Sequence, residues 1–416
     1  MLWFVVTFVL VLGLSTMWWA VVGIGRRVIA LFPWAWTDTW DGTHWRPSDV
    51  AILIAARNEE LVLPATLRAA LKIVGPRQIF VVSDDSSDRT VQIARDHGAR
   101  VMELTRNRGK AGAIAAGIRH FDLPKRFPIV MLLDADTLPA PDYLSTGLPL
   151  FNHREVVAVA GRALTLDDGR STTRLGRVLL AHRERTYVAV QTLHKFGQAA
   201  RLANAVSIVP GFASMYRTDI LDRVDITAPG LAIEDYNMTF EIHTKGLGRV
   251  AFDPTRAHAY TQDPDTLHDY RKQMSRWSLG FWQTLMRHRI QARTFWVGVL
   301  LFAFEVLVSS VLLLLVIPVL VLLGIASVLL AAGIDPHGAL TQVDAFVPVV
   351  ALLLGILVPD LALTLYAAII TRRSRYLLFA PMFPVLRVLD AALCLGALRT
   401  AIVGTSNGVW SSPTRR

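Results

Sequence analysis

The chain has 416 residues, of which 53% are hydrophobic, and a formal net charge of +10 at pH 7. Its mean hydropathy of +0.41 argues against a purely soluble protein. The single cysteine, Cys394, excludes an intrachain disulfide and a cysteine-rich zinc site. No stripe of basic residues with interleaved aromatic side chains is present, so the positive charge favours membrane lipids and an anionic ligand over nucleic acid.

The chain begins with an uncharged apolar run from Leu2 to Ile24, long enough to cross a bilayer as a helix. A cleaved signal peptide is the alternative. It is disfavoured because the run is too long and because Arg26 and Arg27 follow it rather than precede it. We therefore expect residues 1–28 to form an N-terminal transmembrane helix.

Two longer apolar stretches lie near the other end, Phe295 to Ala332 and Val343 to Ile370. Both exceed the roughly 20 residues that a transmembrane helix needs, so residues 295–372 predict two transmembrane helices. The next apolar stretch, residues 376–404, contains two arginines and an aspartate. We expect it to lie in the membrane interface, with a third C-terminal span as the open alternative.

The basic residues beside these segments predict their orientation. Arg26 and Arg27, the cluster around His288 and the arginines after Thr371 all belong on the cytoplasmic side, where basic residues are enriched. The connector between the two predicted transmembrane helices has no Lys or Arg. We therefore expect a multi-pass protein of the inner (plasma) membrane, with its N-terminus outside and its central region in the cytoplasm.

Strand and helix signals alternate through the central region, and we expect one domain over residues 45–290 with amphipathic interface helices at its C-terminal end. Short apolar runs predict buried strands at residues 50–55, 78–82, 129–133 and 156–160. Helices are expected at residues 88–97 and 110–120, and another after Asn58, whose side chain would cap it. This alternation predicts an α/β fold with a doubly wound, mostly parallel sheet, which binds ligands at the carboxyl ends of its strands.

Asp134-Ala135-Asp136 directly follows the apolar strand that ends at Leu133. A solvated turn before a helix is the plain interpretation of this segment. Two carboxylates at a strand exit are also the ligands with which hard divalent cations bind substrate phosphates. The apolarity of the preceding strand leads us to favour a metal site at Asp134 and Asp136.

Asp84 begins a second polar cluster after a buried strand, which continues to Thr90. Capping by Ser87 or Asp88 explains only part of it, and a carboxylate here can accept hydrogen bonds from a base or a ribose.

Lys110 stands at a helix start, where backbone amides and an ammonium suit a phosphate. Its surroundings lack the glycine spacing of a P-loop.

Glu234 and Asp235 form an acidic pair that suits the first turn of a helix. A carboxylate there can also act as the base that removes a proton from an attacking hydroxyl group.

Further along, Gln273, Arg276 and Trp277 share one helical face. The indole can stack on a sugar ring and the guanidinium can pair with a diphosphate, although an interfacial helix has the same composition.

These motifs resemble the family 2 inverting glycosyltransferases. More narrowly, they resemble the membrane-embedded branch with cellulose synthase, hyaluronan synthase and poly-N-acetylglucosamine synthase. The likeness covers about residues 51–282 and the tail, and it implies a glycosyltransferase-A-type domain that needs magnesium or manganese. It also implies roles for individual residues. Donor-binding roles fall on Ala56, Asn58, Glu59, Asp84, Lys110, Asp134 and Arg276.

The remaining roles also follow from the resemblance. Asp134 and Asp136 would hold the metal, Asp235 would be the general base beside Glu234, and the acceptor would contact Gly211, Phe212, Gln273 and Trp277. Trp410 and Arg415, in the tail at residues 405–416, are similar to a segment that closes over the donor. Ile233 stands where the family usually has a threonine.

The resemblance implies sugar transfer with inversion from a nucleotide sugar, UDP-N-acetylglucosamine or UDP-glucose, to a saccharide, with processive synthesis of a β-linked polysaccharide. Transfer of one sugar to a membrane lipid uses the same motifs and stays an alternative. A membrane transporter would not explain the central domain, and the complete set of acidic positions disfavours an inactive subunit. The small membrane region leaves room for an oligomer or an accessory subunit.

Overall fold

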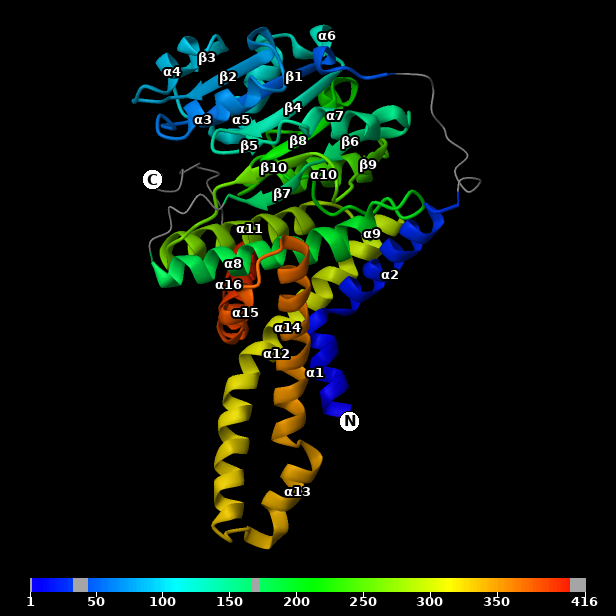
Figure 1. The fold of residues 1–416 in the computed structure, drawn as a ribbon, viewed down its shortest axis with the longest axis vertical. Coiled ribbons are helices and arrows are strands. Elements are labelled where there is room, and N and C mark those ends of the chain that lie inside the picture. The colour runs from blue at the N-terminus through cyan, green and yellow to red at the C-terminus, as the bar shows by residue number, and fades with distance from the viewer. Residues whose placement is uncertain (1, 33–43, 167–172, 405–416) are drawn as a thin grey trace.

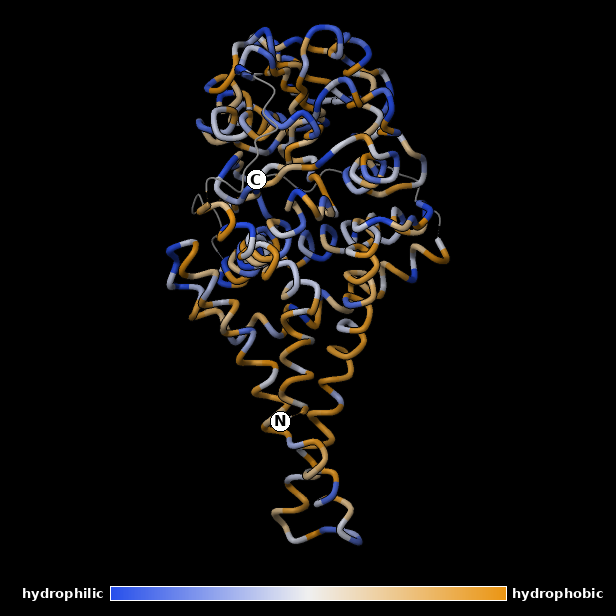
Figure 2. The backbone as a smooth tube through the Cα atoms, turned by 90° about the vertical axis from the view of Figure 1, so that its right-hand side faces the viewer, coloured by the Kyte–Doolittle hydropathy of each residue, from blue (hydrophilic) through white to orange (hydrophobic). Residues whose placement is uncertain are grey.

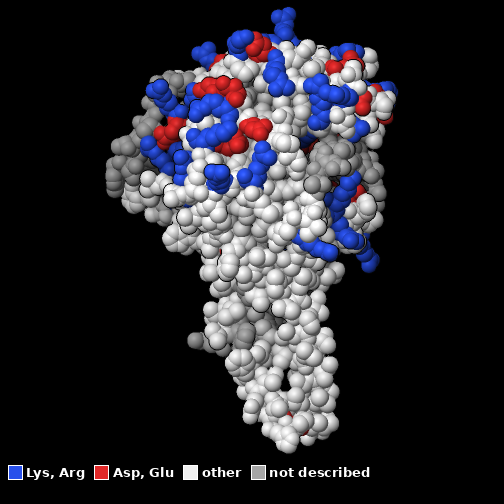
Figure 3. Space-filling model, turned by 180° about the vertical axis from the view of Figure 1, so that it is seen from behind, with Lys and Arg blue, Asp and Glu red and all other residues white. Residues whose placement is uncertain are grey.

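The structure is a computed structural model that describes residues 2–32, 44–166 and 173–404. A head with two β-sheets stands above a stalk of long helices (Figure 1). The stalk is hydrophobic over most of its length (Figure 2), and the Lys, Arg, Asp and Glu side chains on the visible face gather on the head (Figure 3). The predicted gating residues Trp410 and Arg415 lie outside the described residues.

The main sheet has seven strands in the order β3-β2-β1-β4-β8-β6-β9. Their bounds are β1 (Val50–Ala56), β2 (Ile79–Asp84), β3 (Arg100–Leu104), β4 (Ile129–Asp134), β6 (Val156–Ala160), β8 (Ala213–Arg217) and β9 (Arg249–Ala251). β8 runs antiparallel to both of its neighbours, β4 and β6, whereas the other pairings are parallel. The apolar runs of the sequence thus form the predicted strands, because a sheet covered on both faces needs apolar side chains on both.

Short helices cover this sheet: α3 (Leu63–Ala70), α4 (Thr90–Asp96), α5 (Gly109–His120), α6 (Leu123–Arg126), α7 (Tyr143–Gly147) and α10 (Glu234–Thr244). A small second sheet lies below it, with the order β5-β10-β7. Its strands are β5 (Leu138–Pro139), β7 (Arg162–Thr165) and β10 (His258–Thr261). The segment from Leu138 to Ala140 therefore leads from the exit of β4 directly into the second sheet.

Two helices, α8 (Arg174–Ala189) and α11 (Leu267–Arg287), lie side by side beneath the second sheet (Figure 1). α8 continues into η5 (Val190–Lys195), a π-helical turn, and then into α9 (Phe196–Gln198). α2 (Leu14–Ile29) packs against η5 and α9. These helices form a layer that separates the sheets from the stalk, and of them only α11 lies at the C-terminal end of the predicted domain.

The stalk and its upper end contain α1 (Leu2–Leu12), α12 (Thr294–Ala331), α13 (Ala339–Phe346), α14 (Val349–Thr371), α15 (Tyr376–Phe379) and α16 (Phe383–Val403). Among the described residues, three helical segments are long and apolar enough to cross a membrane: 294–331, 349–371 and 376–403. By length and composition, the third therefore also qualifies as a span. Its position in a membrane stays a prediction.

The predicted single helix over residues 1–28 is instead two helices, α1 and α2, joined at Gly13. Gly13 has a φ of 86°, a left-handed conformation that favours glycine. The Glu305 side chain of α12 fills the bend and accepts a 2.7 Å hydrogen bond from the backbone N–H of Ser15. Sequence periodicity could not reveal this break, because the contact that stabilises it comes from a residue far along the chain.

Asn58 does not cap a helix, which corrects that prediction. The helix that follows, α3, begins at Leu63 after Val62 and has no side-chain cap. Asn58 has a φ of 54°, and its Oδ1 accepts a 2.8 Å hydrogen bond from the backbone N–H of Ser87. A contact between two loops at the end of the sheet therefore takes the place of the local cap.

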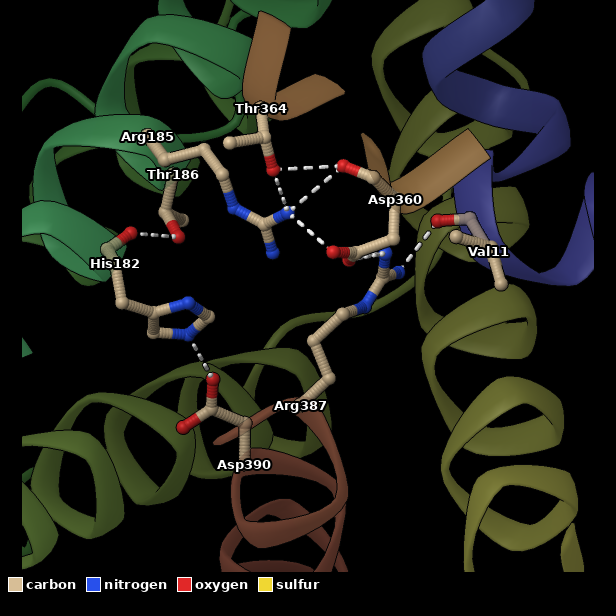
Figure 4. A network of polar contacts seen from close by, with 8 residues as sticks. All are labelled: Val11, His182, Arg185, Thr186, Asp360, Thr364, Arg387 and Asp390. Carbon is tan, nitrogen blue, oxygen red and sulfur yellow. Dashed lines mark hydrogen bonds and ion pairs between the residues drawn. The ribbon is translucent and has the colours of Figure 1, made fainter. Parts of the chain in front are cut away.

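Four consecutive side chains of α8, His182, Arg183, Glu184 and Arg185, are all buried. Three of them join the head to α14, α16 and the segment between them. Arg185 forms an ion pair with Asp360 at 2.9 Å, Glu184 one with Arg373 at 2.7 Å, and His182 contacts Asp390 at 3.0 Å. Arg387 also contacts Asp360 at 3.4 Å and donates to the carbonyl of Val11 (Figure 4). Polar contacts therefore fix α8 to the upper end of the stalk.

Candidate active site

A cavity of about 1220 Å³ lies between the end of the main sheet and the interface helices. It brings together most of the residues singled out in the sequence. The predicted site residues that line it are Glu59, Lys110, Asp134, Asp136, Phe212, Glu234, Asp235, Gln273, Arg276 and Trp277. Residues of α12 and α16, including Phe302 and Ala397, also line it, so the cavity reaches the helices of the stalk.

Lys110, at the start of α5, holds two of the acidic residues together. Its Nζ lies 2.7 Å from Asp134 Oδ1 and 3.0 Å from Glu234 Oε1. Burial alone would lower the pKa of Lys110, but Asp134 and Glu234 outweigh it and raise that pKa well above its ordinary value. Lys110 is therefore a permanent cation. Its ion pairs join the exit of β4 to the first turn of α10.

The two carboxylates of the D-x-D segment lie at the exit of β4, and both line the cavity. The backbone N–H of Asp134 donates a 2.9 Å hydrogen bond to the carbonyl of Phe212, which ties the segment to the loop before β8. Burial raises the pKa of Asp134 despite the neighbouring Lys110, and Asp136 and Glu234 raise it further. Three acidic side chains, Asp134, Asp136 and Glu234, thus lie close to Lys110 at this point.

These acidic side chains raise the question of whether the site fits a divalent cation. Among the described residues, no group of three or more His, Cys, Asp and Glu side chains could hold a metal ion. A cation held by Asp134 and Asp136 would have to complete its coordination with oxygens from a ligand, as magnesium commonly does. The carboxylate oxygens fit such an ion.

Asp235 lies in the first turn of α10 and faces the cavity. Its Oδ2 accepts a 2.7 Å hydrogen bond from the backbone N–H of Gly211. Burial raises the pKa of Asp235 to about 7; Glu234 raises it and Lys110 lowers it. For Glu234, burial acts in the same direction, but Lys110 outweighs it and the pKa falls below its ordinary value. The two adjacent carboxyl groups thus differ in protonation at neutral pH. Glu234 is ionised, whereas Asp235 is near the midpoint of its titration.

Asp84, Asn58 and Ala56 lie at the ends of β1 and β2 and do not line the cavity. Asp84 is fully buried, and its Oδ1 accepts a 2.7 Å hydrogen bond from the backbone N–H of Arg108. Its Oδ2 has no hydrogen-bond partner among the described residues. Burial raises the pKa of Asp84. The predicted nucleoside contact at Asp84 stays a prediction.

Gln273, Arg276 and Trp277 project from α11 into the cavity, as their spacing predicts. Arg276 is exposed and Trp277 is half-buried. The guanidinium of Arg183 lies over the Trp277 ring, 4.4 Å from its centroid. Arg183 of α8 therefore covers the indole of Trp277. Nothing in the Q-x-x-R-W segment itself indicates this contact.

Sequence reasoning missed two buried cations of this cavity, Arg183 and Lys195. Arg183 contacts Asp263 at 3.4 Å and donates a 2.7 Å hydrogen bond to Tyr187. Lys195 lies on the π-helical turn, and its Nζ lies 5.4 Å from the centroid of the Phe252 ring. Burial lowers its pKa to about 8, against the attraction of Asp235. One signal in the sequence could have drawn attention to Arg183. It lies in a run of charged residues, 182–185, which is unusual in an interface helix.

Three comparisons with known proteins bear on the family and the fold of the chain. A family model described as glycosyltransferase like family 2 matches residues 47–280. The poly-beta-1,6-N-acetyl-D-glucosamine synthase of Staphylococcus epidermidis is 26% identical over 261 residues, which cover 61% of this chain and 58% of that protein. The enzyme of that name from Staphylococcus aureus strain COL is 25% identical over 57% of this chain and 56% of that protein. The alignment thus spans less than two thirds of these relatives.

Among solved structures, the chain is similar to a mannosyltransferase from Pyrobaculum calidifontis, solved in complex with GDP-Man and Mn2+. The TM-score is 0.52 and the identity 16%, with 92% of this chain and 99% of that chain covered. This likeness concerns the fold, and it confirms the glycosyltransferase-A-type sheet with helices of membrane-spanning length. Since the family model covers more than half of the sequence, the chain belongs to the glycosyltransferases of family 2.

Proposed function

We propose that the protein is a membrane glycosyltransferase that transfers a sugar, with inversion, from a UDP-sugar to a saccharide acceptor and builds a β-linked polysaccharide. The observation that carries this proposal is the cavity itself. It joins the carboxylates at the exit of β4 and Asp235 to the aromatic and cationic side chains of α11, above helices of membrane-spanning length. The similarity to poly-beta-1,6-N-acetyl-D-glucosamine synthases supports UDP-N-acetylglucosamine as the first donor to test, before UDP-glucose.

Asp235 is the general base in this proposal. Its carboxylate faces the cavity and is oriented by the N–H of Gly211. A pKa of about 7 suits a base that must be ionised before transfer and must accept a proton during it. The acceptor hydroxyl gives its proton to Asp235 and attacks the anomeric carbon from the side opposite the diphosphate, so an α-linked donor gives a β-linked product.

The donor side is built around Lys110 and the D-x-D carboxylates. Asp134 and Asp136 would hold a magnesium or manganese ion, which would neutralise charge on the diphosphate. Lys110 orients Asp134 and Glu234 through its two ion pairs. Arg276, exposed at the cavity, is placed to pair with the leaving diphosphate. Asp84 would contact the nucleoside at the end of β2.

The acceptor side lies at α11 and the loop before β8. Trp277 offers a stacking surface for a sugar ring, Gln273 offers an amide, and Gly211 and Phe212 form the adjoining loop. On this basis the growing end of the saccharide rests beside Asp235, between the sheet and the membrane helices. We place the catalytic domain on the cytoplasmic face of the plasma membrane, where the nucleotide sugar is available.

One observation favours a second candidate, transfer of a single sugar to a membrane lipid. The cavity extends to apolar side chains of α12 and α16, among them Phe302, Val306 and Ala397. Such a lining suits an acceptor with a hydrocarbon part, which would enter from the bilayer.

The test uses purified full-length protein with a panel of nucleotide sugars, magnesium or manganese, and a lipid extract in nanodiscs. Mass spectrometry of the products identifies the sugar and the acceptor together. A ladder of oligosaccharides supports polysaccharide synthesis, and a single added sugar on a lipid supports the second candidate. Failure of every nucleotide sugar to give any product would contradict both.

A further inference from the structure

Arg183 is the one residue of the buried run 182–185 that turns toward the cavity rather than toward the stalk. It lines the cavity, whereas His182, Glu184 and Arg185 do not. Its side chain is 2% exposed, and its guanidinium lies 4.4 Å from the centroid of the Trp277 ring. A cation at this distance over an indole face is attracted by the ring, most strongly where water is excluded.

The Arg183 guanidinium is itself held in place by polar contacts. It lies 3.4 Å from Asp263, and it donates a 2.7 Å hydrogen bond to the hydroxyl group of Tyr187. That hydroxyl group donates in turn to Asp263 at 2.8 Å, and Thr165 donates to the same carboxylate at 2.8 Å. The cation over Trp277 is therefore anchored to β7 and to the segment that follows β10, and it does not depend on a ligand for its position.

The backbone that carries Arg183 is fixed as well. Successive residues of a helix point about 100° apart, so residues 182–185 project around the whole circumference of α8. His182 contacts α16 and Arg185 contacts α14, while Glu184 contacts Arg373 just after α14 (Figure 4 shows the first two). The helices of the stalk thus set the rotation of α8 and, through it, the place of the guanidinium.

We propose that Arg183 is a positioning residue of the acceptor site: it covers one face of the Trp277 ring, fixes the plane of the indole, and leaves the opposite face for the acceptor sugar. This inference rests on the acceptor role proposed for Trp277. Arg183 does not touch the reacting atoms in this account. It acts through Trp277, so its importance should vanish when the indole is absent.

The test is a double-mutant cycle on the full-length enzyme with Arg183→Met, Trp277→Ala and the double variant. The readouts are the rate of sugar incorporation from UDP-N-acetylglucosamine, or from whichever UDP-sugar the enzyme uses, and the ratio of sugar incorporated to UDP released. We expect Arg183→Met to lower incorporation about tenfold and to lower the ratio, because a poorly held acceptor lets water compete for the donor. UDP affinity, measured by calorimetry, should not change.

In the Trp277→Ala background, the same Arg183→Met change should lower incorporation less than about twofold, since coupled residues are not additive. Asp263 keeps its hydrogen bonds from Tyr187 and Thr165 in these variants, which protects the fold. Arg183→Lys is the second variant. It keeps the charge but loses the planar stacking group, and it should restore incorporation only in part. Arg174→Met, at an exposed position of the same helix, is the matched control.

The same variants distinguish an error in this inference from an error in the proposed function. If Trp277→Ala incorporates sugar at the wild-type rate, the acceptor role of Trp277 is wrong and the inference falls with it. If Trp277→Ala is impaired while the effects of the two substitutions simply multiply, Arg183 acts independently and only the inference is overturned. Wild-type incorporation by Arg183→Met would overturn it too.

Discussion

The backbone N–H of Gly211 donates a 2.7 Å hydrogen bond to Oδ2 of Asp235, and this contact links the loop before β8 to the first turn of α10. A Cβ at position 211 would overlap the Asp235 carboxylate. We expect Gly211→Ala to displace Asp235 and to lower the rate of transfer about a hundredfold or more, since small displacements of a catalytic group are costly.

Gly25→Ala is the control for this substitution, because a Cβ there meets no atom within 4 Å. Initial rates and UDP affinity of both variants should be measured on protein with a wild-type melting temperature. Transfer by Gly211→Ala at more than half of the wild-type rate would show that the hydrogen bond does not position the base.

The rate of transfer should fall as the pH drops below about 7. Asp235 has a pKa raised to about 7, and its ionised form, the proposed base, is lost as the pH falls through that value. Glu234→Gln removes a negative charge that raises this pKa, so it should move the acidic limb of the pH–rate profile to lower pH. Lys195→Met removes a positive charge coupled to Asp235 and should move the limb to higher pH. Shifts in the same direction for both variants would contradict the assignment.

Removal of divalent metal with a chelator should abolish transfer, and magnesium or manganese should restore it. Asp136→Ala deletes one of the two proposed carboxylate ligands and should raise the metal concentration for half-maximal activity about tenfold or more. Asp142→Asn, an exposed acidic position directly before α7, should leave the metal titration unchanged. A titration of the Asp136→Ala enzyme that overlays the wild-type curve would exclude this carboxylate as a ligand.

Arg185→Met should lower the stability of the protein strongly. It removes the 2.9 Å partner of Asp360 and leaves that carboxylate buried with only the more distant Arg387, 3.4 Å away (Figure 4). Breaking a buried pair typically costs about 3–5 kcal/mol in the free energy of unfolding. The melting temperature in nanodiscs should fall by several degrees, whereas Arg174→Met should have little effect. An unchanged melting temperature for Arg185→Met would show that the pair does not hold α8 to the stalk.

The parts of the fold that the sequence predicts are those determined by local pattern. The apolar runs before Asp84 and Asp134 form buried strands, and the topology of the sheet then brings these carboxylates to one edge. The i, i+3, i+4 spacing of Gln273, Arg276 and Trp277 likewise places them on one face of α11. The glycosyltransferase-A-type fold and the family were both confirmed.

The sequence could not reveal features that depend on contacts between distant segments. The bend at Gly13 needs Glu305, and the loop conformation of Asn58 needs Ser87. The stacking of Arg183 on Trp277 joins two helices, α8 and α11, that are separated along the chain by strands β8, β9 and β10. No local propensity encodes any of these contacts.

The central claim is that Asp235 acts as the base in sugar transfer from a nucleotide donor. The most direct measurement compares wild-type protein and Asp235→Asn for product formation from UDP-N-acetylglucosamine, or the UDP-sugar that the enzyme uses, and for UDP affinity by calorimetry. Asparagine keeps the acceptor for the Gly211 N–H but cannot take a proton. We expect a loss of at least about a thousandfold in product formation with UDP affinity unchanged. Product formation by Asp235→Asn at the wild-type rate would contradict it.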